Sequence, residues 1–443
     1  MLEFVKSILV ILAAIALFLS SWVVLAAPTI SLLPLGVGAP EISPILLLVH
    51  LIILVLGYLV SLRATGTDFT PLILTTDVPG TIILVFSIFG LGLSSIPLLQ
   101  LPSTLRQAEQ QMQQGLGADY LADIPARQQE RMRSHPFNPY ALVQGIDTPN
   151  IIPEQRSLST PDGATLKVDI YHPVLDNQPL NPSSDKYSVL VTIYGGAWKS
   201  GDPKQKAQFN SYMAAQGYGV VALDYRHAPE YKFPTQINDV VAVLDWMTTV
   251  ADEYSWDRDR VALIGWSAGG HLAMLAAYSP LLGGAGGGSP RRGGAGGGSP
   301  RRGGAGGGSI TIKAVVNYYG PVDLAAGYAD PPIPDPIDNR AVLELFLGGS
   351  PTQVPDTYRD ASPITYVRPG LPPTLLVYGD RDHLVKPIFG YQLHDQLKAQ
   401  GNRSILLRLP WAEHAFDAIF SGMGNQIALY HTERFLAWAL HSR

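Results

Sequence analysis

The chain has 443 residues, more than one average domain contains, and 47% of them are hydrophobic. Its formal net charge of −5 provides no basic field of the kind that attracts nucleic acid, so nucleic acid is not an expected partner. Because the chain contains no cysteine, disulfide bonds, thiolate metal sites and a cysteine nucleophile are excluded. These values fit one membrane part followed by one large globular part.

Three uncharged apolar segments lie near the N-terminus, at residues 7–27, 44–62 and 80–101. Each has about the 20 residues that a helix needs to cross the hydrocarbon core of a bilayer. The sequence therefore predicts a membrane region over residues 1–103 with about three transmembrane helices, in an integral membrane protein that has the lipid bilayer as a partner. Lys6 and the apolar run after it would also fit a signal peptide, but the later two segments would then still remain in the membrane. Lysines and arginines near the segment ends favour neither side of the membrane for the globular part.

One ionisable side chain, His50, lies inside the second apolar segment. An ionisable group at this depth can belong to a proton or substrate path. Because no acidic, basic or second histidine residue lies within these segments to relay a proton, we expect a neutral histidine that contacts another helix.

Residues 104–150 separate the apolar segments from the globular part. As far as residue 133 they are rich in Gln, Glu, Arg, Ala and Leu, which is typical of a partly amphipathic helix. A solvated helical connector is the simpler interpretation. A lid over an active site is the alternative.

From residue 151 to residue 443, short β-rich runs alternate with helical ones, which is typical of a mostly parallel sheet with helices on both faces. Strands are expected, after a hairpin at 158–172, at residues 188–194, 220–225, 261–265, 313–318, 374–378 and 404–409. The clearest helices are expected at 233–254, 268–278 and 426–442, the last with Asn425 as its N-cap. The sequence thus predicts an α/β domain over residues 151–443.

A low-complexity tract interrupts this domain at residues 283–309. It repeats the ten-residue unit GGAGGGSPRR twice and adds a shortened third copy. Such a tract cannot bury a core, so we expect a disordered insertion. An Arg/Gly nucleic-acid binder is the alternative, and the acidic net charge disfavours it.

A G-x-S-x-G motif at residues 265–269 lies between an apolar strand pattern and a helical pattern. The tight turn from strand to helix needs both glycines, and it places the serine hydroxyl at the carboxyl edge of the strand beside the amides of the helix N-terminus. Ser267 is therefore the candidate nucleophile.

A second glycine turn, at residues 194–198, follows another apolar strand pattern. Its backbone amides can point outward and form an oxyanion hole beside the serine. The expected donors are the amides of Gly196, Ala197 and Ala268, with Gly195 as a further candidate.

Candidates for the base and the acid follow the last two expected strands. His414 comes just after the last one, whereas His271 and His383 are more easily explained as packing or hydrogen-bonding residues. The preceding strand is followed by Asp380 and Asp382, of which we choose Asp382 as the acid and expect Asp380 to form the turn.

Residues 194–202, 224–230 and 265–271 resemble the hormone-sensitive-lipase and bacterial feruloyl-esterase-like (BD-FAE-like) branch of the α/β-hydrolases. The resemblance covers about residues 151–443 and implies the α/β-hydrolase fold, in which the nucleophile, acid and base follow in that chain order. Family members carry His-Gly-Gly-Gly or His-Gly-Gly-Ala where this chain has Tyr194 before its glycines. The resemblance implies hydrolysis of an acyl group without a metal or an organic cofactor.

The motifs together predict a membrane-anchored serine hydrolase that cleaves small-molecule or lipid-like carboxylic esters with Ser267, Asp382 and His414. An amidase or peptidase using the same triad, as in arylformamidases, is the first alternative. A non-catalytic, membrane-tethered binding module is the second. Because every candidate residue lies beyond residue 151, a chain that begins after about residue 101 is expected to stay active.

Overall fold

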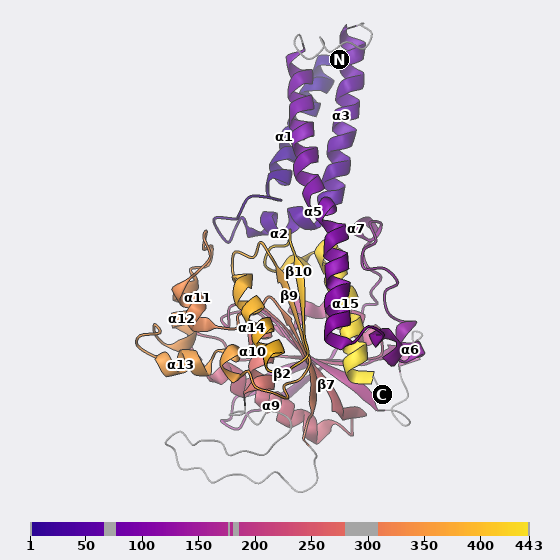
Figure 1. Cartoon of the computed structure of the whole chain (residues 1–443). Helices are drawn as coiled ribbons and strands as arrows, with labels where there is room; N and C mark the ends of the chain where they lie inside the picture. The colour runs from indigo at the N-terminus through magenta and orange to yellow at the C-terminus, as the bar shows by residue number, and fades with distance from the viewer. Residues whose placement is uncertain (1, 66–76, 176–177, 180–185, 280–308, 442–443) are drawn as a thin grey trace.

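The computed structural model describes residues 2–65, 77–175, 178–179, 186–279 and 309–441. All but the last residue of the repeat tract lies outside these ranges. A stalk of long helices extends from one end of a layered α/β domain (Figure 1).

Three helices of the described chain are long and apolar enough to cross a membrane: α1 (Leu2–Ser21), α3 (Ser43–Thr65) and α5 (Val78–Leu116). Helix α1 ends before residue 27, and turns and the short helix α2 (Leu33–Glu41) connect it to α3. Helix α5 continues well past the expected end at residue 101, because the Gln, Ala and Glu residues that follow the apolar segment are good helix formers. One continuous helix therefore joins the stalk to the globular part.

Two polar clusters connect the stalk helices where their apolar faces meet. Toward the outer end, Lys6 Nζ lies 2.9 Å from Asp77 Oδ2, which also accepts a hydrogen bond from Ser61. Toward the globular part, Ser20 Oγ lies 3.0 Å from His50 Nε2 and 2.9 Å from Ser94 Oγ. His50 thus contacts α1, as its isolation in the sequence suggested.

In the described part of the chain, eight strands form one sheet in the order β1-β2-β6-β5-β7-β8-β9-β10. β1 and β2 are antiparallel to each other, β2 is antiparallel to β6, and the six remaining strands are parallel. The strands are β1 (Glu154–Ser159), β2 (Thr165–Tyr171), β5 (Tyr187–Ile193), β6 (Gly219–Leu223), β7 (Trp256–Trp266), β8 (Ile312–Tyr318), β9 (Thr374–Gly379) and β10 (Ser404–Leu409). A separate two-stranded ribbon pairs β3 (Val174–Leu175) with β4 (Gln178–Pro179).

Helices cover both faces of the sheet, with α10 and α14 on one side and α15 on the other (Figure 1). Every residue of β5, β6 and β9 is buried, as expected for parallel strands between two helical layers. The longer helices are α8 (Ala207–Ala215), α9 (Thr235–Val250), α10 (Ala268–Tyr278), α12 (Asn339–Leu347), α14 (Pro387–Ala399) and α15 (Met423–His441). The shorter α-helices are α6 (Ala126–Gln129), α7 (Ala141–Gln144), α11 (Leu324–Ala329) and α13 (Pro355–Asp360).

The stretch 104–150 packs against the sheet edge and α15. The Arg403 side chain, at the start of β10, donates to the carbonyl of Leu116 at the end of α5. Further on, Glu433 of α15 accepts a hydrogen bond from the amide of Arg133. This stretch therefore attaches the stalk to the side of the α/β domain.

Candidate active site

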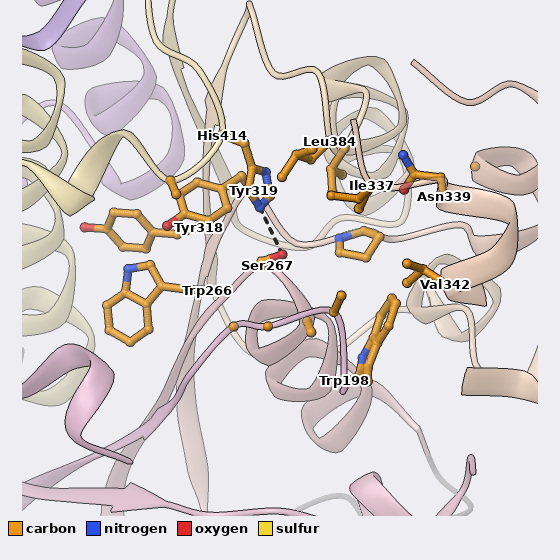
Figure 2. A pocket seen from close by; sticks show the side chains of 18 of the residues that line it. Trp198, Trp266, Ser267, Tyr318, Tyr319, Ile337, Asn339, Val342, Leu384 and His414 are labelled. Atoms are coloured by element: carbon orange, nitrogen blue, oxygen red, sulfur yellow. Dashed lines mark hydrogen bonds between the residues drawn. The ribbon is translucent and has the colours of Figure 1, made fainter. Parts of the chain in front are cut away.

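The structure brings Ser267, His414 and Asp382 together in one hydrogen-bonded chain. His414 Nε2 lies 3.0 Å from Ser267 Oγ, and His414 Nδ1 lies 2.7 Å from Asp382 Oδ2 (Figure 2 shows the serine contact). The three residues come from the carboxyl ends of β7, β9 and β10, because parallel strands end at the same edge of the sheet. This is the arrangement that serine hydrolases use to remove the proton from their nucleophile.

Ser267 lies in a strained turn between β7 and α10. Its φ of 52° and ψ of −121° are in a region that residues other than glycine rarely adopt. A Cβ atom on Gly265 would approach Gly269 O to 2.1 Å, and one on Gly269 would approach Ile193 O to 2.0 Å. Both glycines of the motif are therefore required by close backbone contact, and the turn holds the hydroxyl above the helix N-terminus.

The two aspartates after β9 have different environments. Asp382 Oδ1 accepts hydrogen bonds from the amides of Leu384 and Val385, so Oδ2 remains for His414. Asp380 instead pairs with Arg408 at 2.7 Å and accepts a hydrogen bond from the Tyr391 hydroxyl. Burial raises the pKa of Asp382, and the contact with His414 opposes that shift.

The glycine turn after β5 lies directly against the nucleophile. A Cβ atom on Gly195 would be 3.1 Å from Ser267 Cβ, and the backbone of both Gly196 and Ala197 has positive φ, at 138° and 52°. Gly195, Gly196, Ala197 and Ala268 all line the cavity above Ser267. The structure thus gathers the four expected donor residues beside the serine.

His271 has the packing role expected for it. Its Nε2 lies 2.6 Å from the carbonyl oxygen of Ala361, and its Nδ1 accepts a hydrogen bond from the indole of Trp198. Burial lowers the pKa of His271 to about 4, so the ring is neutral. Trp198 in turn stacks on Phe346 at 4.2 Å between ring centres, which fixes one wall of the cavity.

Glu413 is a residue of the site that the sequence analysis did not single out. Its Oε1 accepts hydrogen bonds from the amides of His383 and His414, and its Oε2 pairs with His383 Nδ1 at 2.5 Å. The carboxylate therefore ties together the two loops that carry the acid and the base. It also raises the pKa of the His383 imidazole. The acidic residue directly before His414 is the feature of the sequence from which this role could have been predicted.

A second missed group flanks His414 on its other side. The ring of Tyr319 lies 4.5 Å from the His414 ring, and its hydroxyl donates to Asp417. Asp417 also pairs with Lys206 Nζ at 2.5 Å. All three residues line the cavity, so they provide a polar wall opposite the apolar one.

The cavity above Ser267 has a volume of about 640 Å³. Figure 2 shows Ile337 and Val342, from the segment between β8 and β9, and Leu384 beside His414 around its apolar side. Residues 104–150 are all described, and none of them lines this cavity. Within the described ranges, no group of three or more His, Cys, Asp or Glu residues could hold a metal ion.

The stalk contributes directly to the site. Ile30, between α1 and α2, lines the cavity, and the fully buried Glu41 accepts the amides of Gly424 at 2.6 Å and Asn425 at 3.4 Å. The prediction that Asn425 is the N-cap of the last helix is wrong, because α15 begins earlier, at Met423. The amides in the first turn of α15 are instead bound by Glu41. Burial raises the pKa of Glu41 to about 8 against the effect of those amides. A truncation after residue 101 would remove both contacts.

Comparisons with known proteins agree with this geometry. The BD-FAE family model matches residues 168–397, just over half of the chain. Two relatives from Mycobacterium tuberculosis are "Probable carboxylic ester hydrolase LipM", 32% identical over 56% of this chain and 54% of its own length, and "Esterase LipC", 31% identical over 52% and 53%. The chain thus spans about half the length of these curated relatives.

The structure also resembles that of Thermogutta terrifontis esterase 2 phosphonylated by sarin. The match has a TM-score of 0.50 at 24% identity and covers 66% of this chain and 94% of the esterase. This likeness concerns the fold of the α/β part. With the family match, it shows that the chain belongs to the BD-FAE family and has the α/β-hydrolase fold that follows its membrane-type helices.

Proposed function

We propose that the protein is a membrane-anchored serine hydrolase that cleaves carboxylic esters through an acyl-enzyme intermediate. The observation that carries this proposal is the continuous hydrogen-bonded chain from Asp382 through His414 to Ser267, which ends in an open cavity. The names of LipM and LipC, an ester hydrolase and an esterase, support the choice of ester.

The geometry supports the following sequence of steps. His414 Nε2 takes the proton of Ser267 as Oγ attacks the ester carbonyl, and Asp382 holds the imidazole in the tautomer that this transfer needs. The developing oxyanion is stabilised by backbone amides of the turn at 195–197 and of Ala268. His414 then protonates the leaving alcohol, and it activates a water molecule that releases the acid.

Two other functions remain distinct alternatives to this proposal. An amidase or peptidase would use the same triad, but no contact in the cavity favours a leaving amine over a leaving alcohol among the described residues. A binding module without activity would not need a serine in a strained turn with a histidine at 3.0 Å. The site therefore favours a catalytic function over a binding module, and the names of the relatives favour an ester over an amide.

The test uses the full chain in membranes. A fluorophosphonate probe should label the wild-type protein but not Ser267→Ala, because only an activated serine reacts. Hydrolysis of p-nitrophenyl esters of graded chain length should be faster than hydrolysis of the matching aryl amides. Wild-type protein that is folded but neither labelled nor active would refute the proposal, and faster amide cleavage would reassign it to an amidase.

A further inference from the structure

The cavity above Ser267 shares its wall with the base of the stalk. Leu384 and Ile337 both line the cavity, and both pack in an apolar cluster with stalk residues. The stalk side of this cluster includes Trp22, Val23, Ala27, Leu33 and Val37. The site is therefore built against the membrane helices rather than at a distance from them.

The position of the helix ends places this wall near the bilayer surface. Helix α1 has 20 residues, which gives about 30 Å of length, the thickness of a hydrocarbon core. It ends at Ser21, and α3 begins at Ser43, so the turns at 22–32 follow directly where the apolar spans end. Figure 1 shows α2 between the stalk and the α/β domain, and α2 contacts α15 just beyond the loop that carries His414.

Exposed apolar side chains lie in the two segments that border this side of the cavity. Val24 and Leu25 are 40% and 51% exposed, and Ile30, which lines the cavity, is 56% exposed. Ile333 is 90% exposed in the loop that runs from Pro332 to Ile337, both of which line the cavity. We call Val24, Leu25, Ile30 and Ile333 the apolar rim.

The composition of the rim fits a lipid surface better than water. Residues 22–32 contain no charged residue, and Ile333 lies between two prolines. Large apolar groups exposed together mark a surface that contacts another apolar phase. The helices that adjoin the rim are long and apolar enough to lie in a bilayer, so the bilayer is the apolar phase next to the rim.

We infer, resting on the proposed ester hydrolysis, that the apolar rim lies in the bilayer interface and that the cavity takes its substrate from the membrane. The substrate class is then a lipid ester whose long acyl chain resides in the bilayer. If the acyl chain had to enter water first, each of its methylene groups would add an unfavourable free energy of transfer. A cavity that opens at the bilayer avoids that step.

The location of the rim can be measured without any assay of activity. Because the chain contains no cysteine, single cysteines at Leu25→Cys and Ile333→Cys can each carry an environment-sensitive fluorophore in full-length protein in phosphatidylcholine vesicles. The matched control is Ile152→Cys, which is 84% exposed and precedes β1 at the edge of the sheet opposite Ser267.

Quenching by lipids with a nitroxide near the headgroup should be several-fold stronger at positions 25 and 333 than at 152. Aqueous iodide should show the reverse order. Equal quenching of all three labels by iodide, with none by the lipid nitroxide, would overturn the placement of the rim.

The substrate class is tested by the ratio of two rates in vesicles, for p-nitrophenyl palmitate in the bilayer and for water-soluble p-nitrophenyl butyrate. The double variant Leu25→Asp/Ile333→Asp should lower this ratio about tenfold, because it places charges in the bilayer interface. Ile152→Asp places its charge in water and should leave the ratio within about twofold. The same ratio in both variants would overturn the inference while leaving ester hydrolysis intact. Wild-type protein that cleaves neither ester would instead refute the proposed function, and the labels would still locate the rim.

Discussion

A serine hydroxyl lies against a histidine ring both in the candidate active site and in the stalk. Ser267 Oγ lies 3.0 Å from His414 Nε2, and Ser20 Oγ lies 3.0 Å from His50 Nε2. The distances are equal, but the surroundings are different. His414 has Asp382 on its other nitrogen, whereas no carboxylate is hydrogen-bonded to Nδ1 of His50 within the described residues.

The backbone and the space around each serine differ as well. Ser267 is held at positive φ above an open cavity, whereas Ser20 lies within α1, with its hydroxyl also bonded to Ser94. Neither Ser20 nor His50 lines the cavity. A Ser–His distance alone therefore does not identify a nucleophile; the acid, the amide donors and the space for a substrate do.

The first prediction, with the largest expected effect, compares the loss of turnover in Ser267→Ala and Ser20→Ala. Ser267→Ala should lower turnover on p-nitrophenyl esters by about a million-fold, because the members of a triad act as a unit. Ser20→Ala removes the stalk contact only and should keep turnover within about twofold. Turnover and melting temperature of both proteins in the same detergent make the measurement. Residual activity of a tenth or more in Ser267→Ala would refute its assignment as the nucleophile.

The second prediction concerns the acid that distinguishes His414 from His50. Asp382→Asn should lower turnover by roughly 10⁴-fold, since an amide at this position favours the wrong tautomer of His414. Asp380→Asn weakens contacts with Arg408 and Tyr391, neither of which touches His414, and should cost much less. Steady-state kinetics on one soluble ester compare the two variants. The opposite ranking would assign the acid to Asp380.

The third prediction addresses the amide donors that the stalk contact lacks. Gly196→Ala should lower turnover by about 10²- to 10³-fold, the usual result of losing one donor, because a Cβ atom there would come within 1.9 Å of Ser200 O and shift the turn. Gly92→Ala, in α5, meets no atom within 4 Å and serves as the control. Unchanged turnover in Gly196→Ala, with a normal melting curve, would exclude this turn from the oxyanion hole.

The smallest effect is expected at Glu41, where the two regions meet. Burial raises the pKa of Glu41 to about 8 in the folded chain, from an ordinary value of 4.5. Between these values the folded state holds a proton that the unfolded state has lost, so the free energy of unfolding decreases as the pH rises from about 4.5 through about 8. Because glutamine cannot ionise, Glu41→Gln should remove this decrease in the free energy of unfolding.

Melting temperatures at pH 5 and pH 9 test this prediction. The wild type should lose several degrees more than Glu41→Gln over that interval. Glu130→Gln, at an exposed acid outside the stalk, is the control for the loss of a carboxylate. The same pH dependence in wild type and Glu41→Gln would show that Glu41 is ionised in the folded state at neutral pH.

The sequence by itself determined the features that depend on neighbouring residues. The strand, the glycines and the helix around Ser267 follow one another within a few positions, so the strained turn could be predicted from them. The three long apolar helices could be predicted for the same reason, since length and composition are local properties. The chain order of Ser267, Asp382 and His414 then restricted the choice among the histidines.

Only the tertiary structure decided the features that join distant parts of the chain. Glu41 binds the amide of Gly424 across 383 positions, Ile30 reaches the cavity, and Glu413 ties the loops of Asp382 and His414 together. No local pattern specifies these partners, because they arise only when the base of the stalk and the loops after β9 and β10 come together in the fold. Burial of Glu41 and exposure of the apolar rim are likewise consequences of that packing, in which the base of the stalk and the α/β-hydrolase fold share one apolar wall.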